Sequence, residues 1–207
     1  MQHMQNGKTI IGLTGQSGSG KSYIASLFEK RGFFVVDADK VARQVTSDSE
    51  VVQKLVELFG QNVATDNQLN RRILANIVFS DKTQLNKMNQ LLFPIICDRM
   101  ITMANISKQP YILFDAPQLF ESGLNNLCQT VIAVVAPHDL LIKRITRRDK
   151  ITVEEAENRL SSQLSVEFFQ KHADYVVCSG DRQQQWENDI NTIINQVTST
   201  GHDIFEF

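Results

Sequence analysis

Residues 15–22 have the sequence Gly15-Gln16-Ser17-Gly18-Ser19-Gly20-Lys21-Ser22. The apolar run of residues 10–14 precedes them, and residues 23–28 follow with apolar side chains at helical spacing. The order strand, glycine-rich loop, helix, together with the pattern G-x-x-x-x-G-K-[ST], predicts a phosphate-binding loop.

The chemistry of a bound polyphosphate explains the residue types in this loop. Glycines remove side chains that would block the approach of backbone N–H groups. The helix that opens at Gly20 adds unpaired amides and the positive end of its dipole. Lys21 is expected to reach the β- and γ-phosphates and the Ser22 hydroxyl to ligate Mg²⁺. A plain turn before a helix does not require this Lys-Ser pair, so phosphate binding is the favoured interpretation.

Composition limits the class of protein. The 207 residues suffice for one α/β core with a small insert. Apolar content is 42%, charged content 21% and net charge −2, which argues against a basic field for nucleic acid or anionic membrane. No apolar run is long enough to span a bilayer, and the leading residues 1–7 are too polar for a signal peptide.

The cysteines suggest a reducing environment. Cys97, Cys128 and Cys178 are odd in number and widely spaced, without a C-x-x-C motif. This pattern argues against a disulfide framework or a zinc site and predicts three small buried apolar residues in a cytoplasmic protein.

A second apolar run, residues 33–36, predicts a strand buried on both faces and ends in Asp37-Ala38-Asp39. Ligands of open parallel sheets bind at the carboxyl ends of strands, so both acids are expected at the edge that carries the phosphate loop. While the chain stays extended, Asp37 and Asp39 share a face.

The following block, residues 41–108, shows helical patterns and no convincing strand. One amphipathic helix is expected to stop at Gly60, a second to start after Asn70, and a new one to open at Pro94. We interpret the block as a helical insert that holds a phosphoryl acceptor.

Two further strands carry candidate site residues. Residues 111–114 end in Asp115, a position that commonly supports the Mg²⁺ shell in phosphate-loop proteins. Residues 131–135 precede a helix from about His138, on which Arg144 and Arg148 are four apart and project together. This pair could clamp a transferring phosphoryl group.

The remaining segments predict a mobile lid and a closing unit. Thr152-Val153-Glu154-Glu155 is a capping box, and the helix it opens is expected to run through Leu164, presenting Arg159 and Gln163. A short strand at residues 175–177 and a helix with an apolar stripe at residues 186–197 complete the chain.

Several of these stretches, in order, resemble the dephospho-coenzyme A kinase family. They are residues 12–22, Asp37-Ala38-Asp39-Lys40-Val41-Ala42-Arg43, Asp115-Ala116-Pro117-Gln118-Leu119-Phe120-Glu121, residues 144–149, residues 159–163 and Ala173-Asp174. The run after the second strand is more discriminating than the phosphate loop.

The resemblance implies ATP-dependent phosphorylation of the ribose 3′-hydroxyl of dephospho-CoA. It implies an α/β, three-layer P-loop kinase fold with a mostly parallel five-stranded sheet, a helical acceptor-binding insert and a helical lid. The expected core covers residues 8–40, 109–149 and 173–200, the acceptor region residues 41–108 and the lid residues 150–172. A cytoplasmic monomer acting on small molecules is expected.

The resemblance also implies residue roles. Asp39 would face the ribose hydroxyl as general base or orienter, and Lys21, Arg144 and Arg148 complete the catalytic set. ATP would be bound by Gly15, Gly18, Ser19, Gly20, Lys21, Ser22, Tyr23 and Arg159. The acceptor would be bound by Asp37, Asp39, Arg43, Arg71 and Asp115, and Mg²⁺ by Ser22 and Asp115.

The chain departs from the family pattern among its adenine and acceptor contacts. The residues that differ are Ser17 for Ile, Tyr23 for Thr, Asn70 for Asp, Phe93 for His, Gln118 for Leu, Leu141 for Gln, and Cys178-Ser179 for Asp-Asn. Two other functions therefore stay open. They are a kinase for another small hydroxyl acceptor, such as a nucleoside or nucleotide, and a non-catalytic nucleotide-binding regulator.

Overall fold

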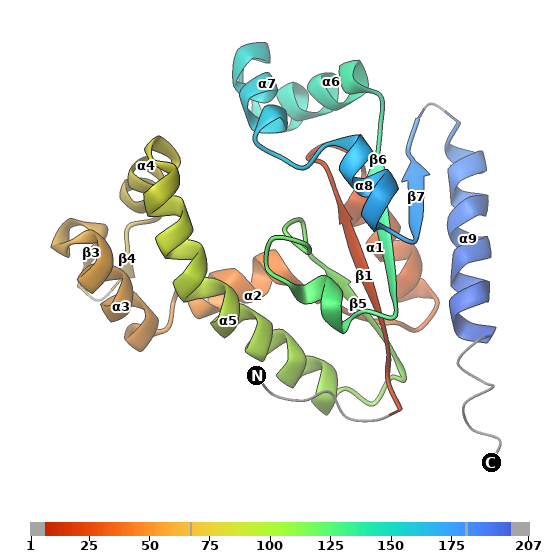
Figure 1. Cartoon of the computed structure of the whole chain (residues 1–207), viewed down its shortest axis with the longest axis horizontal. Helices are drawn as coiled ribbons and strands as arrows, with labels where there is room; N and C mark the ends of the chain where they lie inside the picture. Colours follow the sequence, from red (N-terminus) through yellow and green to blue (C-terminus); the bar gives the residue numbers. More distant parts are fainter. Residues whose placement is uncertain (1–6, 67, 181, 200–207) are drawn as a thin grey trace. The chain divides into compact units, whose positions relative to one another are not determined.

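A computed structural model describes residues 7–66, 68–180 and 182–199 (Figure 1). The described chain forms two compact units. The first, Asp37–Ile106, is called the insert unit, and the second, residues 7–36 with 107–199, the core unit. The leading residues 1–6, expected to be a polar start, lie outside the described part.

The core unit is built on a five-stranded sheet. Its strands lie in the order β2 (Phe34–Asp37), β5 (Tyr111–Asp115), β1 (Thr9–Gly15), β6 (Thr130–Val135) and β7 (Tyr175–Cys178). The pairs β1–β5, β1–β6 and β6–β7 are parallel. Because β1 is central, six of its seven residues are buried, which explains why its sequence is apolar without alternation.

Helices cover both faces of the sheet, as the three-layer prediction requires. On one face, α1 (Lys21–Lys30) and α9 (Gln183–Ser199) pack Ile24, Phe28 and Ile190 against β-strand residues such as Leu13. On the other, Phe169 of α8 (Val166–His172) packs against β6. The predicted α/β class and five-stranded sheet are confirmed.

The second strand differs from the expectation of burial on both faces. Only Val36 within β2 is buried, and Phe34 and Val35 are half-buried. The reason is topological, because β2 lies at the edge of the sheet and has a neighbour on one side only.

The predicted lid helix is shorter than expected. After α6 (His138–Asp149), helix α7 (Val153–Ser161) begins with the predicted capping box but ends before Gln163 and Leu164. Ser165 then caps the separate helix α8 through its hydroxyl, which accepts from the Phe168 N–H. Because Ser165 caps a new helix four residues after α7 ends, the single longer helix predicted from the apolar spacing does not form. A short 3₁₀ turn, η2 (Leu124–Leu127), lies earlier in this unit.

The insert unit contains α2 (Ala38–Val45), α3 (Ser49–Phe59), α4 (Arg71–Ser80) and α5 (Lys82–Ile106). Gly60 ends α3 and Asn70 caps α4, both as predicted. A 3₁₀ turn η1 (Gln61–Val63) and a hairpin, β3 (Ala64–Thr65) with β4 (Gln68–Leu69), join them. The expectation of no strand in this block was therefore wrong.

Pro94 does not open a new helix, because it lies inside the continuous 25-residue helix α5. Proline removes one helical hydrogen bond and crowds the preceding turn. Buried side chains on both sides of it, including Leu92, Ile96 and Met100, hold the helix together in spite of that cost.

The cysteines are less uniform than predicted. All three are free thiols, but only Cys97 is buried, Cys128 is half-buried and Cys178 is exposed. Burial raises the pKa of the Cys128 thiol to about 12. Among the described residues, no helix combines the length and apolar character that a membrane crossing needs.

Candidate active site

The phosphate loop, residues 15–22, joins β1 to α1 within the core unit. Gly15 and Gly18 adopt φ values of 151° and 80°, which L side chains rarely adopt. A Cβ on Gly15 would also lie 2.2 Å from the carbonyl oxygen of Val134 in the neighbouring strand. Both the dihedral angle and the tight packing therefore require glycine.

The start of α1 is suited to anions. Gly20 is its N-cap, in the left-handed conformation, and provides no side chain to cap the first amides. Lys21, Ser22 and Tyr23 follow, without an acidic residue in the first turn. No side chain among the described residues therefore caps the start of α1, and its amides and the helix dipole can bind a phosphate.

Lys21 and Asp115 form an ion pair at the carboxyl end of the sheet. The Lys21 ammonium donates to the Asp115 carboxylate, with side-chain exposures of 13% and 9%. The two residues meet because β5, which ends in Asp115, is the direct neighbour of β1. The sequence predicted both residues for the site, and the structure joins them.

Mg²⁺ would find oxygen ligands here. Ser22 offers an exposed hydroxyl and Asp115 a carboxylate, which are the hard ligands that Mg²⁺ prefers. Within the described residues, no three acidic, histidine or cysteine side chains gather into a metal cluster. This donor set fits a Mg²⁺ ion that keeps several waters and takes further oxygens from a nucleotide.

Arg144 braces the phosphate loop from α6. Its guanidinium donates to the Gly18 carbonyl at 3.1 Å, and to the hydroxyl and carbonyl of Ser179 at 3.0 Å each. The buried Ser179 hydroxyl in turn donates to the Ser19 carbonyl. Ser179, one of the departures from the family pattern, was missed as a site residue because its contacts are distant in sequence, 35 positions to Arg144 and 160 positions to Ser19.

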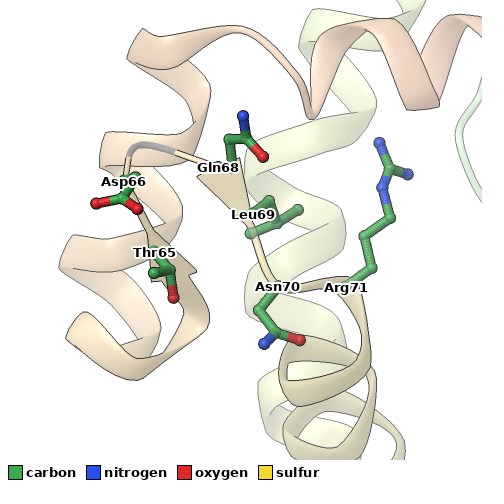
Figure 2. A pocket seen from close by; sticks show the side chains of 6 residues that line it. All are labelled: Thr65, Asp66, Gln68, Leu69, Asn70 and Arg71. Carbon is green, nitrogen blue, oxygen red and sulfur yellow. The ribbon is translucent and has the colours of Figure 1, made fainter.

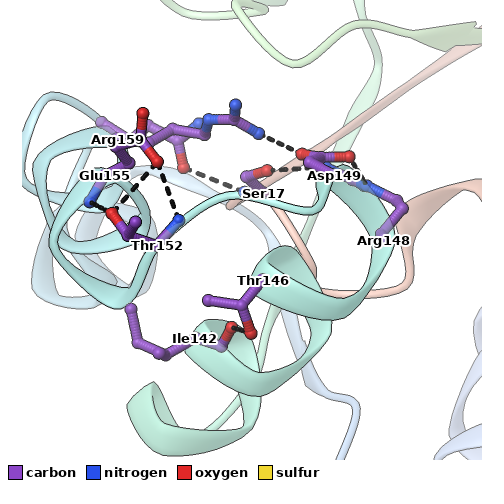
Figure 3. Close-up of polar contacts among 9 residues, drawn as sticks. Ser17, Ile142, Thr146, Arg148, Asp149, Thr152, Glu155 and Arg159 are labelled. Atoms are coloured by element: carbon purple, nitrogen blue, oxygen red, sulfur yellow. Dashed lines mark hydrogen bonds and ion pairs between the residues drawn. The ribbon is translucent and has the colours of Figure 1, made fainter.

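Arg148, Asp149 and Arg159 form a second polar group beside the loop (Figure 3). The Asp149 carboxylate accepts from Nε and Nη2 of Arg148 at 2.8 and 3.0 Å, and from Arg159 of α7. The hydrogen bonds from Arg148, and then those from Arg159, hold the pKa of Asp149 far below its usual range. Arg148 also donates to the Ser17 hydroxyl, and the Gln163 side chain accepts from the Ser17 N–H.

Arg144 and Arg148 thus contact the loop directly, and Arg159 is linked to Arg148 through Asp149. The closure of these three arginines over ATP stays a prediction. The part played by Asp149 was missed. An acid next to an arginine in sequence is common on solvated helices, and nothing in the spacing shows that a second helix shares it.

Tyr23 contacts α9 through its ring and hydroxyl. The hydroxyl donates to Glu187 at 2.6 Å, and the ring packs edge-on against Trp186, with centroids 5.5 Å apart. Its hydrogen bond to Glu187 raises the Tyr23 pKa and lowers that of Glu187. The structure accordingly gives Tyr23 an anchoring role on α9, and its predicted contact to nucleotide stays a prediction.

Asp37 is the last residue of β2, and the chain turns into α2 directly after it. The Asp37 side chain caps α2 by accepting from the Lys40 N–H at 3.0 Å, so Asp39 lies in the first turn of a helix. The expectation that the two acids share a strand face was therefore wrong. Asp39 is exposed and makes no hydrogen bond or ion pair among the described residues.

Arg71 lies near Arg43 in the same unit, and its guanidinium donates to the Arg43 carbonyl at 3.0 Å. It also lines a surface pocket of about 480 Å³ (Figure 2). The pocket residues come from the hairpin and the start of α4, and they are Thr65, Asp66, Gln68, Leu69, Asn70 and Arg71. The pocket is polar and includes one of the predicted acceptor-binding cations.

A parallel sheet with helices on both faces, a glycine loop at the end of its central strand and a paired lysine define the class of P-loop kinases. The family model described as dephospho-CoA kinase matches residues 9–184. The chain belongs to the dephospho-CoA kinase family.

Curated relatives support this assignment. The Fusobacterium nucleatum dephospho-CoA kinase is 36% identical over 169 residues, which cover 81% of this chain and 88% of that protein. The Lactobacillus johnsonii dephospho-CoA kinase is 32% identical over 193 residues, which cover 91% and 98% of the two chains.

Solved structures agree in fold. A Thermus thermophilus protein superposes with a TM-score of 0.80 at 28% identity, covering 91% of this chain and 97% of its own. A shikimate kinase from Acinetobacter baumannii, at 17% identity, has a TM-score of 0.54, covering 93% of this chain and 94% of its own. The second likeness concerns the fold alone.

Proposed function

We propose that this protein transfers the γ-phosphoryl group of ATP to the ribose 3′-hydroxyl of dephospho-CoA, giving coenzyme A and ADP. The observation that carries the proposal is the family match along residues 9–184, which includes the phosphate loop and the helix with Arg144 and Arg148. Loop, lysine and arginines supply what phosphoryl transfer needs, which is positioning and charge stabilisation.

On the donor side, the amides at the start of α1 and the Lys21 ammonium bind the β- and γ-phosphates. Asp115 keeps the ammonium at the end of the sheet, so the cation is in place before the nucleotide arrives. Ser22 and Asp115 would hold Mg²⁺, which would supply positive charge to the phosphates. Arg144 fixes the loop, and Arg148 and Arg159 provide positive charge for the equatorial oxygens of the transferring group.

On the acceptor side, Asp39 is the proposed base or orienter. The 3′-oxygen attacks the γ-phosphorus as the bond to the β–γ bridging oxygen breaks, and the hydroxyl proton passes to the Asp39 carboxylate. In a loose transition state this proton moves late, which suits a base as weak as an aspartate. Asp37, Arg43 and Arg71 are the other proposed acceptor contacts.

The proposal includes the organisation predicted from sequence. Residues 41–108 bind the acceptor, and residues 150–172 act as a lid over ATP. A cytoplasmic monomer is also proposed, supported by the three free thiols and by the small size of the substrates.

A coupled assay of ADP release tests the proposal. Purified protein is given ATP and Mg²⁺ with dephospho-CoA, adenosine or AMP as acceptor, and the product is checked for a 3′-phosphate. We expect turnover with dephospho-CoA and its loss in Lys21→Ala. Turnover with adenosine or AMP alone would identify a kinase for another acceptor, and ATP binding without turnover would identify a non-catalytic binder.

A further inference from the structure

Ser17, in the middle of the phosphate loop, makes two hydrogen bonds, one of which an apolar residue could not make. Its hydroxyl accepts a hydrogen bond from Nη2 of Arg148 at 3.2 Å. Its backbone N–H donates to the side-chain oxygen of Gln163 at 2.9 Å. Only the first of these bonds depends on the serine side chain, so the two can be separated by substitution.

The guanidinium of Arg148 has one occupied edge and one open edge. Nε and Nη2 face the Asp149 carboxylate, and Nη2 also reaches Ser17 (Figure 3). Among the described residues, Nη1 makes no hydrogen bond. The side chain is 58% exposed, so an unrestrained arginine here would lose much rotamer freedom when it binds a phosphoryl group.

The two partners of Arg148 restrain it differently. Asp149 is its neighbour in sequence at the end of α6, so the pair can move together with that helix end. Ser17 lies 131 positions earlier, in the loop itself. The serine bond is therefore the contact that relates the guanidinium to the phosphate-binding amides.

Asp149 extends this arrangement to a second arginine. Its carboxylate also accepts a hydrogen bond from Arg159 of α7. Four residues after Arg159, the side-chain oxygen of Gln163 accepts from the Ser17 N–H. Hydrogen bonds thus connect the phosphate loop with the end of α6, and both of these with α7 and the segment after it. All of these residues lie within the core unit.

We propose that Ser17 is a positioning residue, whose hydroxyl orients Arg148 so that its open edge meets the transferring phosphoryl group. The proposal rests on the proposed function, because it assumes that Arg148 acts on ATP. An apolar side chain at this position would have no acceptor atom for that bond, so the orientation depends on the serine hydroxyl.

The test combines substitution with a double-mutant cycle. Steady-state kinetics with ATP and dephospho-CoA are measured for wild type, Ser17→Ala, Ser17→Thr, Arg148→Ala and the double variant Ser17→Ala with Arg148→Ala. Ser199→Ala is the matched control, because that hydroxyl donates only to Asn195 within α9. Thermal unfolding and ATP binding are measured for each protein to separate folding from positioning.

We expect Ser17→Ala to lower kcat by about three- to ten-fold, the size of one hydrogen bond, with little change in KM for ATP. Ser17→Thr keeps the hydroxyl and should retain most of kcat. In the Arg148→Ala background, Ser17→Ala should have no further effect, because the residue acts through that arginine.

Other outcomes overturn the inference. If Ser17→Ala keeps the wild-type kcat, or if the two substitutions lower kcat independently, Ser17 does not position Arg148. If Ser17→Thr has a kcat as low as that of Ser17→Ala, loss of the hydroxyl does not explain the lower kcat. An inactive wild-type protein would instead refute the proposed function, which distinguishes the two failures.

Discussion

Asp37 and Asp39 are separated by one residue and have different tasks. The Asp37 carboxylate accepts from the Lys40 N–H and pairs with the Lys40 ammonium, while Asp39 has no hydrogen bond or ion pair among the described residues. An unpaired exposed carboxylate keeps its lone pairs available for a substrate hydroxyl. This makes Asp39, and not Asp37, the better candidate base.

Replacement of Asp39 by Asn should lower kcat by about 10²–10⁴-fold, the range of general-base assistance, and leave ATP binding nearly unchanged. Kinetics with dephospho-CoA and binding of a nucleotide in the absence of acceptor check both parts. Asp48→Asn is the matched control, because Asp48 caps α3 through its side chain and asparagine caps equally well. Full turnover of Asp39→Asn would remove Asp39 from the mechanism.

Site residues could be predicted from the sequence where the motif that marks them is contiguous. Lys21 and the glycines follow from a contiguous pattern, and Asp115 follows from its place after a strand. Ser179 and Asp149 act through partners on other elements, so their roles depend on how α6, α7 and β7 pack. No spacing within a single segment contains that information.

Helix α7 is short and begins with a capping box. It has nine residues, and isolated helices of this length are marginal in water. The Thr152 hydroxyl accepts from the Glu155 N–H, and the Glu155 carboxylate accepts from the Thr152 N–H. The bond from the Thr152 backbone N–H, and then a bond from the Thr152 hydroxyl to the same carboxylate, lower the pKa of Glu155.

Thr152→Ala removes the cap and should cost about 1 kcal/mol of stability. Hydrogen exchange should locate the loss in α7, with faster exchange of its first amides. In Thr192→Ala, the lost hydroxyl donates only to Asn188 within α9, so α7 should be unaffected. Unchanged protection of α7 in Thr152→Ala would show that packing of Ala156 and Leu160 alone maintains the helix.

There are physical reasons why the sequence patterns did not predict the hairpin and the continuous helix α5. The hairpin β3–β4 has strands of two residues, too short for an alternating pattern to appear. The continuity of α5 through Pro94 is decided by packing on both sides of the proline, which outweighs the local preference for a break. Capping signals, in contrast, are local, and Asn70 and Thr152 were both predicted correctly.

For the whole molecule, one strong titration effect lies at Asp149, outside the sheet. Asp149 has a pKa well below its ordinary value of 3.8, first because Arg148 donates to it and also because Arg159 does. A carboxyl with a lowered pKa in the folded state stabilises the fold above its ordinary pKa. That contribution is lost as the pH falls below 3.8 towards the lowered value.

Comparison of wild type with Asp149→Asn isolates this effect. The stability difference between the two proteins, measured by denaturant unfolding, should be constant near neutral pH and shrink as the pH falls below about 4. It should also shrink at high salt, because the ion pairs are partly exposed. A difference that persists unchanged at low pH would mean that Asp149 acts through shape and not through charge.

The structure divides the described chain into two units, and the domain bounds predicted from the sequence stay a prediction. The sequence indicated a helical block at residues 41–108, and the structure groups Asp37–Ile106. A separate lid at residues 150–172 stays a prediction, because α6, α7 and α8 belong to the core unit in the structure. Mobility of a segment depends on energy differences between states, which no pattern of residue types expresses.

The packing of Tyr23 against α9 also has an optical consequence. Trp186 is the only tryptophan of the chain, it is 9% exposed, and its ring lies edge-on to Tyr23, two positions after Lys21. Its emission therefore comes from one environment, in contact with Tyr23 of the helix that begins at Lys21. The protein contains an intrinsic fluorophore that reports on the anchoring of its nucleotide-binding helix without any label.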